Sequence, residues 1–213
     1  MKLYGYFRSS ASFRVRIALA LKEINYENIP VHLLNEGGEQ YKADYTEINP
    51  QQLVPSLIDG EAVITQSLAI VEYLDAKYPG VMPLVPKDIW LAAKARQIAY
   101  AIACDIHPMN NLRVLQYLKG ELKVDDEVKN TWYHHWVLTG FTAIEKMLGE
   151  TCDQYCLGDQ LSLADVCLIP QVYNAKRFNC DLTKFPRILA IYEHCMEHDA
   201  FIQAAPENQP DAG

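Results

Sequence analysis

The order of strand and helix signals in the first eighty residues is the feature that most constrains the fold of this chain. Apolar residues recur there either at every second position or at every third to fourth position, the periods of a strand and of a helix. The predicted elements are a strand over 2–7, a helix over 13–24, a strand over 29–33, a hairpin over 53–65 and a helix over 67–78. A parallel crossover followed by a hairpin indicates a small α/β domain with a mixed sheet.

Residues 78–83 contain two prolines and a glycine, a composition that marks a linker. Beyond this segment strand signals nearly vanish and helical periodicity dominates. Five helices are predicted, over 90–105, 111–119, 127–148, 163–174 and 188–197. The chain is therefore predicted to fold as an α/β domain over residues 1–80, followed by an all-α domain over residues 86–213.

Two local signals add detail to the helical domain. Ser162 and Asp165 have the spacing of a capping box, in which each side chain accepts a hydrogen bond from the backbone of the other residue. The tail over 204–213 is polar and contains proline, so we expect an irregular segment on the surface.

Charge and composition argue against several classes of function. The chain has 213 residues, a formal net charge of −8 and a pI near 5.2, whereas nucleic-acid-binding proteins usually carry a basic face. No run approaches the roughly 20 apolar residues of a membrane helix, and no secretory segment follows Met1. The six cysteines form no C-x-x-C pair, so no zinc site is predicted. A disulfide framework is not expected in a chain of this size without a secretion signal. A cytoplasmic protein without nucleic-acid or membrane partners is expected.

Ser9 and Ser10 occupy the corner between the first predicted strand and the first predicted helix. Backbone N–H groups at a helix start lack intrahelical acceptors, and the helix dipole makes this end positive. A hydroxyl at this corner can donate to an anion such as a thiolate. Serines before a helix are also common N-caps, and the local sequence alone favours that structural role.

Two further motifs have both a structural and a binding interpretation. A proline interrupts an apolar strand pattern at Val54-Pro55, where a cis bond would free the Val54 backbone to pair with a peptide-like ligand. Only about 5–6% of X-Pro bonds are cis in folded proteins, so the sequence alone does not support that conformation. Gln66-Ser67 begins the last helix of the α/β domain, where donors suit a carboxylate and where serine can equally cap the helix.

Taken together, these motifs resemble those of zeta-class glutathione transferases, which include the maleylacetoacetate isomerases. The hallmark of that class, S-S-C-x-x-R-V-R-I-A-L, is matched at residues 9–19, with Ala11 in place of the cysteine. We interpret Ala11 as a variant that keeps the function, although the family's thiol is lost. The resemblance extends in order over nearly the whole chain, through 49–57, 66–74, 106–115, 158–159, 163–165, 170–172 and 177–178.

The resemblance implies a thioredoxin-like domain that binds glutathione and a helical domain on the substrate side. It assigns catalysis to Ser9 and Ser10, with Ser9 hydrogen-bonded to the glutathione sulfur. The residues implied to bind glutathione are Ser9, Ser10, Ala11, Gln40, Val54, Pro55, Gln66, Ser67, His107 and Asn111. Arg8, Arg113 and Arg177 are implied to hold the carboxylates of the substrate, because guanidinium groups bind carboxylates through two hydrogen bonds. No metal is implied.

The activity implied by the resemblance is the isomerisation of maleylacetoacetate to fumarylacetoacetate, a step of tyrosine catabolism, by reversible addition of the glutathione thiolate. Three alternatives stay open: a maleylpyruvate isomerase, a general glutathione-conjugating transferase and a non-catalytic binding module. The three arginines and the tail 204–211 resemble maleylpyruvate enzymes, whereas Ser9-Ser10 favours maleylacetoacetate.

The family implies a homodimer. Arg14 and Arg16 are assigned a structural role because they fall inside the first helix.

Overall fold

The computed structural model describes residues 1–212, which form two compact units. The first unit comprises Met1–Leu84 together with the described residues from Met196 onward, and the second unit is Val85–Cys195. Residues after 195 had been expected in the helical domain. They pack instead with the first unit, because a short C-terminal helix lies against the first helix of the chain.

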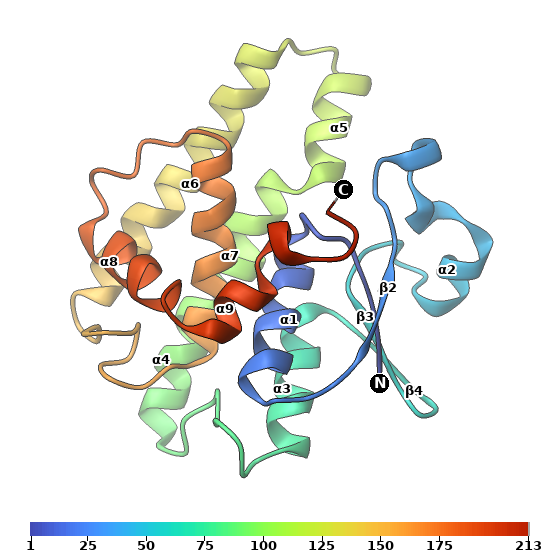
Figure 1. Cartoon of the computed structure of the whole chain (residues 1–213). Helices are drawn as coiled ribbons and strands as arrows, with labels where there is room; N and C mark the ends of the chain where they lie inside the picture. The colour runs from blue at the N-terminus through green and yellow to red at the C-terminus, as the bar shows by residue number, and fades with distance from the viewer. Residues whose placement is uncertain (213) are drawn as a thin grey trace. The chain divides into compact units, whose positions relative to one another are not determined.

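A four-stranded mixed sheet forms the centre of the first unit, with the strand order β2-β1-β3-β4 (Figure 1). Its strands are β1 (Lys2–Gly5), β2 (Glu27–Pro30), β3 (Ser56–Asp59) and β4 (Ala62–Thr65). β1 pairs in parallel with β2 and antiparallel with β3, and β3 and β4 form the predicted hairpin. Gly60 lies in the hairpin turn with a φ of +62°, a conformation that glycine adopts without strain. The predicted mixed sheet is therefore present.

The strands are shorter than their apolar patterns predict. β1 ends at Gly5 because a hydrogen-bonded turn over residues 6–9 follows at once. β2 lies earlier than the predicted strand over 29–33, and Val31 N–H donates to the Gly5 carbonyl at 2.7 Å, where β1 ends. β3 begins only after Pro55, which has no N–H to donate to a neighbouring strand.

Helices lie on both sides of the sheet of the first unit. They are α1 (Ser10–Leu21), α2 (Ala43–Ile48) and α3 (Ser67–Lys77). α1 and α3 pack against each other on one side of the sheet, and α2 lies on the other side (Figure 1). α1 ends before the predicted Ile24, because Glu23 adopts a left-handed φ of +54°. Two arginines inside α1 are buried: Arg14 and Arg16 are only 2% and 3% exposed, so both guanidinium groups need partners inside the unit.

The second unit is helical, as predicted. Its helices are α4 (Ile89–Tyr100), which continues through a π-helical segment (Ala101–Ile106) and a 3-10 turn (His107–Asn110), then α5 (Leu112–Gly120), α6 (Asp126–Leu148), α7 (Leu163–Arg177) and α8 (Pro186–Cys195). All five predicted helices are present with shifted ends. The predicted capping box starts α7: Asp165 is fully buried and accepts from the N–H groups of Ser162 and Cys156, each at 2.8 Å.

The C-terminal tail over 204–213 was predicted to be irregular and on the surface; in its described residues, 204–212, it is partly buried, and Gly213 lies outside the described residues. Asp199–Ala204 forms α9, and Pro206–Asn208 forms a 3-10 turn. Ala204 and Ala205 are 3% and 1% exposed, because α9 packs against α1. Small alanines give little hydrophobic pattern, which is why the sequence did not indicate this packing.

None of the helices in residues 1–212 has the length and apolar character that crossing a membrane requires.

Candidate functional site

Ser9 lies at the N-terminal end of α1, in the turn that connects β1 to this helix. Its N–H donates to the Tyr6 carbonyl at 2.9 Å, and its hydroxyl oxygen accepts from the Ser12 N–H at 3.2 Å. The N-cap role considered for Ser9 is therefore present. Accepting this bond leaves the hydroxyl hydrogen able to donate to a ligand, since a serine hydroxyl both donates and accepts. The Ser9 side chain is half-buried rather than sealed in the core.

Ser10 and Ala11 form the first turn of α1, where backbone N–H groups point out of the helix end. Ser10 is 4% exposed and Ala11 is half-buried. This turn contains no acidic side chain, so none of its own carboxylates offsets the positive potential of the helix end. An anionic group placed beside Ser9 would be stabilised by this arrangement.

Val54 and Pro55 lie in a loop before β3 that is held from within the first unit. The Leu53 carbonyl accepts hydrogen bonds from the Tyr45 hydroxyl and from the Asn49 side-chain amide, both at 2.6 Å. Burial raises the pKa of Tyr45, so this hydroxyl stays protonated and keeps donating. The Val54–Pro55 bond is cis, the conformation that the sequence alone did not support. The loop thus presents a half-buried Val54 at a fixed position.

Gln66 and Ser67 begin α3 without a side-chain cap. Gln66 is the N-cap residue, with a left-handed φ of +69° that is uncommon for a residue with a Cβ, and its amide nitrogen donates to the Gln51 side chain at 2.7 Å. Ser67 is the first helical residue and accepts from the Arg14 guanidinium at 3.3 Å, so the predicted capping role of Ser67 is wrong. The N–H groups at the start of α3 suit a ligand carboxylate.

Gln40 lies in a 3-10 turn (Glu39–Tyr41) of the first unit and is 4% exposed. Among the described residues, its side-chain oxygen is buried without a hydrogen-bond partner. Gly38 packs closely against the same amide. A Cβ at this position would lie 2.6 Å from the Gln40 side-chain nitrogen, so only glycine leaves room for it. A buried polar atom of this kind is costly unless a ligand or a water satisfies it. The environment of Gln40 therefore favours its predicted role in binding, which stays a prediction.

His107 and Asn111 lie together where the 3-10 turn meets α5. The Asn111 amide nitrogen and His107 Nε2 are 3.4 Å apart, and Asn111 Oδ1 accepts from the Arg113 N–H at 3.1 Å, which caps α5. The Trp132 indole N–H donates to the Met109 carbonyl at 2.7 Å and ties this turn to α6. The fold of the second unit therefore places His107, Asn111 and Arg113 on one short segment.

All three arginines predicted to bind the substrate are exposed. Arg8 lies in the turn before α1, with its guanidinium 4.8 Å from the centre of the Phe7 ring. Arg177 ends α7; its Nε donates to the Asn174 side-chain oxygen at 3.1 Å, and its guanidinium lies 4.8 Å from the centre of the Phe178 ring. Ring contacts of this kind orient a guanidinium while leaving its edge able to bind a carboxylate.

The first unit offers polar groups that fit an elongated, peptide-like anion. Ser9 provides a hydroxyl at the positive end of α1, and the start of α3 provides N–H groups without a side-chain cap. Glutathione is a tripeptide with two carboxylates and a thiol, so it fits these residues. Within residues 1–212, no group of three or more His, Cys, Asp or Glu side chains is arranged to hold a metal ion.

Two residues that hold the Ser9 turn were not assigned to the site from the sequence. The Phe7 N–H donates to Asp211 Oδ2 and the Phe7 carbonyl accepts from Arg16 Nη2, each at 3.0 Å. Asp211 lies in the tail whose resemblance to maleylpyruvate enzymes was noted, but it is 204 positions from Phe7, and no local sequence signal indicated their contact. The structural role assigned to Arg16 agrees with its burial and its bonds to backbone carbonyls.

The chain is similar over its whole length to known proteins. Residues 1–76 match the glutathione S-transferase N-terminal domain. A probable maleylacetoacetate isomerase of Vibrio cholerae is 53% identical over 210 residues, which cover 99% of this chain and 97% of that protein. A holo maleyl pyruvate isomerase, a bacterial glutathione S-transferase of the zeta class, has a TM-score of 0.96 at 44% identity, with 100% of both chains covered. A maleylacetoacetate isomerase of Methylobacterium extorquens AM1 with bound malonate and glutathione has a TM-score of 0.95 at 38% identity, again with 100% of both chains covered.

Proposed function

Because the chain belongs to the zeta-class glutathione transferases, the family of the maleylacetoacetate isomerases, we propose that it converts maleylacetoacetate to fumarylacetoacetate by glutathione-dependent cis–trans isomerisation. Glutathione is the cofactor of this family. The observation that carries the proposal is the Ser9 hydroxyl at the N-terminal end of α1, where an anionic sulfur is stabilised. The choice of substrate is supported by the V. cholerae relative, which is 53% identical.

The chemistry needs a nucleophile that can be added and then released. When bound, glutathione would supply a thiolate that adds reversibly to the conjugated double bond, which becomes single and can rotate before release of the thiolate restores it in the trans form. Ser9 donates its hydroxyl hydrogen to the sulfur and so favours the ionised thiol. Ser10 and Ala11 add the positive potential of the helix start through their N–H groups. Glutathione is not consumed, and neither oxidation nor reduction occurs.

The rest of the tripeptide is assigned to other groups of the first unit. The Val54 backbone pairs with the cysteinyl unit, and Pro55 shapes the loop that presents it. Gln66 and Ser67 hold the γ-glutamyl carboxylate at the start of α3, which has no side-chain cap. Gln40 reaches the glycyl end, where its buried side-chain amide gains a partner.

The second unit contributes the remaining proposed binding groups. His107 and Asn111, which lie 3.4 Å apart through their side chains, contribute to glutathione binding. Arg113 and Arg177, with Arg8 of the first unit, hold the two carboxylates of the substrate. Their positive charge also stabilises the negative charge that develops on the substrate during addition. The malonate bound to the M. extorquens relative is a dicarboxylate, which supports a diacid substrate.

Maleylpyruvate is the main alternative substrate, because the zeta-class relative with a TM-score of 0.96 is a maleyl pyruvate isomerase. The deciding experiment measures loss of the cis isomer of each compound, with and without glutathione. A higher kcat/KM for maleylacetoacetate, dependent on glutathione, supports the proposal, whereas a preference for maleylpyruvate replaces the substrate. Glutathione binding without turnover of either compound would favour a conjugating transferase. An absence of glutathione binding would favour a non-catalytic module.

Arg177→Ala is expected to raise the KM for the diacid by roughly 10- to 100-fold, because one charged pair of hydrogen bonds to a carboxylate is lost. Arg177→Lys should fall between wild type and alanine, since lysine keeps the charge but not the paired geometry. Lys176→Ala is the matched control, because Lys176 is the adjacent exposed cation and lies 4.5 Å from the centre of the Tyr192 ring. Equal KM values for Arg177→Ala and Lys176→Ala in steady-state assays would refute the assignment.

The proposal includes a cytoplasmic homodimer that acts in tyrosine catabolism, as the resemblance implies. α4 exposes large apolar side chains that support an interface, with Ile89 and Trp90 88% and 57% exposed. Exposed apolar patches of this kind often mark protein–protein contacts. Light scattering should give a mass twice the 24.2 kDa of one chain, and a mass near that of a single chain would contradict the dimer.

A further inference from the structure

The C-terminal segment of the chain is bonded to the turn that carries Ser9. The Phe7 N–H donates to Asp211 Oδ2 at 3.0 Å, a contact between residues 204 positions apart. Upstream of Asp211, Ala205 is buried against the first unit at 1% exposure. The carboxylate is therefore brought to the Phe7 backbone by an ordered segment, and a hydrogen bond to a charged acceptor is stronger than one to a neutral acceptor.

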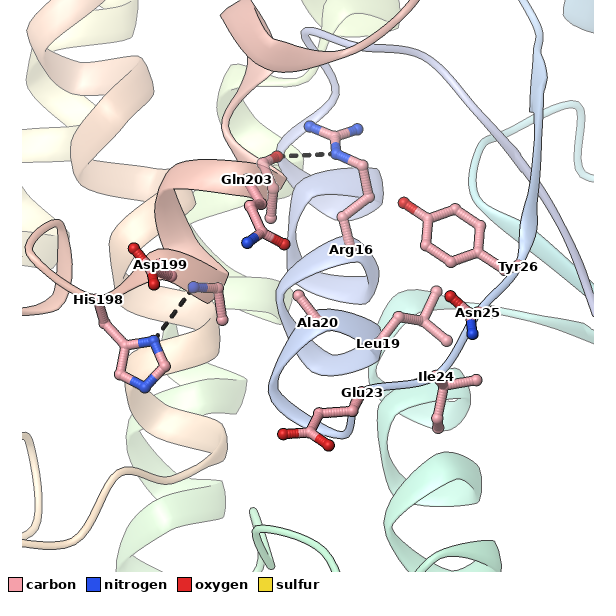
Figure 2. Close-up of a pocket in the computed structure, with 12 residues that line it drawn as sticks. Arg16, Leu19, Ala20, Glu23, Ile24, Asn25, Tyr26, His198, Asp199 and Gln203 are labelled. Carbon is pink, nitrogen blue, oxygen red and sulfur yellow. Dashed lines mark hydrogen bonds between the residues drawn. The ribbon is translucent and has the colours of Figure 1, made fainter.

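Arg16 joins the same turn to the same segment. Its Nη2 donates to the Phe7 carbonyl at 3.0 Å, and its Nε donates to the Ala204 carbonyl at 2.9 Å, the bond drawn beside the label of Gln203 in Figure 2. A weaker contact of 3.5 Å joins Nη1 to the Tyr6 carbonyl. The guanidinium borders an open hollow of about 640 Å³ between α1 and α9 (Figure 2). Both backbone groups of Phe7 are therefore held, one by Asp211 and the other by Arg16.

Tyr26 gives a second indication that these charges lie close together. Burial raises the pKa of Tyr26, while the positive charge of Arg16 lowers it and the negative charge of Asp211 raises it. The phenol of Tyr26 therefore stays neutral, with the cation of Arg16 and the anion of Asp211 both close to it. In Figure 2, the Tyr26 ring lies next to the Arg16 side chain at the wall of the hollow.

The geometry of the turn connects Phe7 to the proposed reaction site. Phe7 and Arg8 are the central residues of the turn that closes when Ser9 N–H donates to the Tyr6 carbonyl at 2.9 Å. Any rotation of the Phe7 peptide groups therefore moves Arg8 and Ser9 together. A displacement of about 1 Å at a reacting group is enough to slow an enzyme substantially.

We propose that Asp211 is a positioning residue, which sets the orientation of the Ser9 hydroxyl by holding the Phe7 N–H. This inference rests on the proposed function, because it concerns the residue assigned to the glutathione sulfur. Asp211 touches neither glutathione nor substrate in this proposal. Its effect is expected on the ionisation of the bound thiol and on kcat, with little effect on the affinity for glutathione.

The test compares Asp211→Ala with Asp211→Asn in the full-length protein. The amide oxygen of asparagine can still accept from Phe7 N–H, so it should restore most of what alanine loses. Asp199→Asn is the control, because Asp199 is an exposed acid of α9 outside the Phe7 contact. The readouts are the kcat of isomerisation, the glutathione Kd by calorimetry, and the pKa of the bound glutathione thiol from its thiolate absorbance.

Asp211→Ala is expected to lower kcat by about tenfold and to raise the pKa of the bound thiol, with the glutathione Kd changed less than about threefold. Asp211→Asn and Asp199→Asn should stay near wild type in all three readouts. Weaker glutathione binding in Asp211→Ala with an unchanged thiol pKa would show a merely structural role and would overturn the inference.

The thiol titration also separates this inference from the proposed function. It needs only bound glutathione, so it remains decisive even if maleylacetoacetate is not the substrate. A lowered thiol pKa in wild type that persists in Asp211→Ala rejects the positioning role alone. A bound thiol with an ordinary pKa in wild type rejects the role proposed for Ser9, and the positioning role with it.

Discussion

Replacing Ser9 with alanine is expected to lower kcat by about 10²-fold at saturating glutathione, because the hydrogen bond to the sulfur is lost. Without that donor, the thiol of bound glutathione should ionise at higher pH, so the rate profile should shift toward alkaline pH. Initial rates measured across a pH series check both effects. A kcat within about twofold of wild type would contradict the assignment of Ser9 as the catalytic donor.

Ser9 also caps α1 by accepting from the Ser12 N–H, so controls must separate the cap from the donor. Ser9→Ala is expected to lower the free energy of unfolding by about 1 kcal/mol, because alanine cannot accept the capping hydrogen bond from Ser12 N–H. Ser9→Thr keeps both a cap and a hydroxyl and should retain most activity. Ser9→Asp keeps a strong cap but has no hydrogen to donate at neutral pH, so it should be as stable as wild type and nearly inactive. If Ser9→Asp were as active as Ser9→Thr, only the cap would matter.

Lys22→Met is expected to destabilise the first unit by about 3–5 kcal/mol, since it breaks an ion pair whose lysine is fully buried. Lys22 Nζ lies 2.7 Å from Asp75 Oδ1 and donates to the carbonyls of Val81 and Met82 at 2.9 Å and 3.2 Å. The substitution leaves the Asp75 carboxylate without its cation and these carbonyls without their donor. Hydrogen exchange of the α1 and β1 amides measures the loss directly.

The measurement must report on the first unit, because all three tryptophans lie in the second unit. Lys77→Met is the matched control: Lys77 pairs with Asp59 at the surface, so its loss should change exchange much less. Removing both charges, with Lys22→Met and Asp75→Leu together, should recover part of the lost stability, because no unpaired charge is left buried. Equal changes in hydrogen exchange for Lys22→Met and Lys77→Met would show that the buried ion pair stabilises the first unit no more than the surface pair does.

Local sequence signals predicted the elements well and their limits less well. The order of strands and helices, the hairpin with Gly60 and the capping box of Ser162 and Asp165 are all present in the structure. Each of these depends on residues that are close in sequence, so the pattern contains the necessary information. The strand ends differed because pairing stops where the partner strand stops, which no single segment encodes.

The candidate site was predictable to the extent that a family motif marks it. The zeta-class resemblance and the glutathione-transferase fold are confirmed by full-length similarity to relatives and solved structures. The individual roles of residues such as Gln40, His107 and Arg177 remain predictions for mutagenesis. The cis bond at Val54–Pro55 could not be inferred, because most X-Pro bonds are trans.

The sequence by itself determined which elements form, in what order, and which family and cofactor the chain shares. Tertiary structure alone decided which buried polar groups meet, as in the contacts of Arg16 with Ala204 and of Asp211 with Phe7. The physical reason is the range of the interactions. Helix caps, turns and apolar periodicity act over a few residues, whereas a buried hydrogen bond joins whichever groups the packed chain brings within about 3 Å.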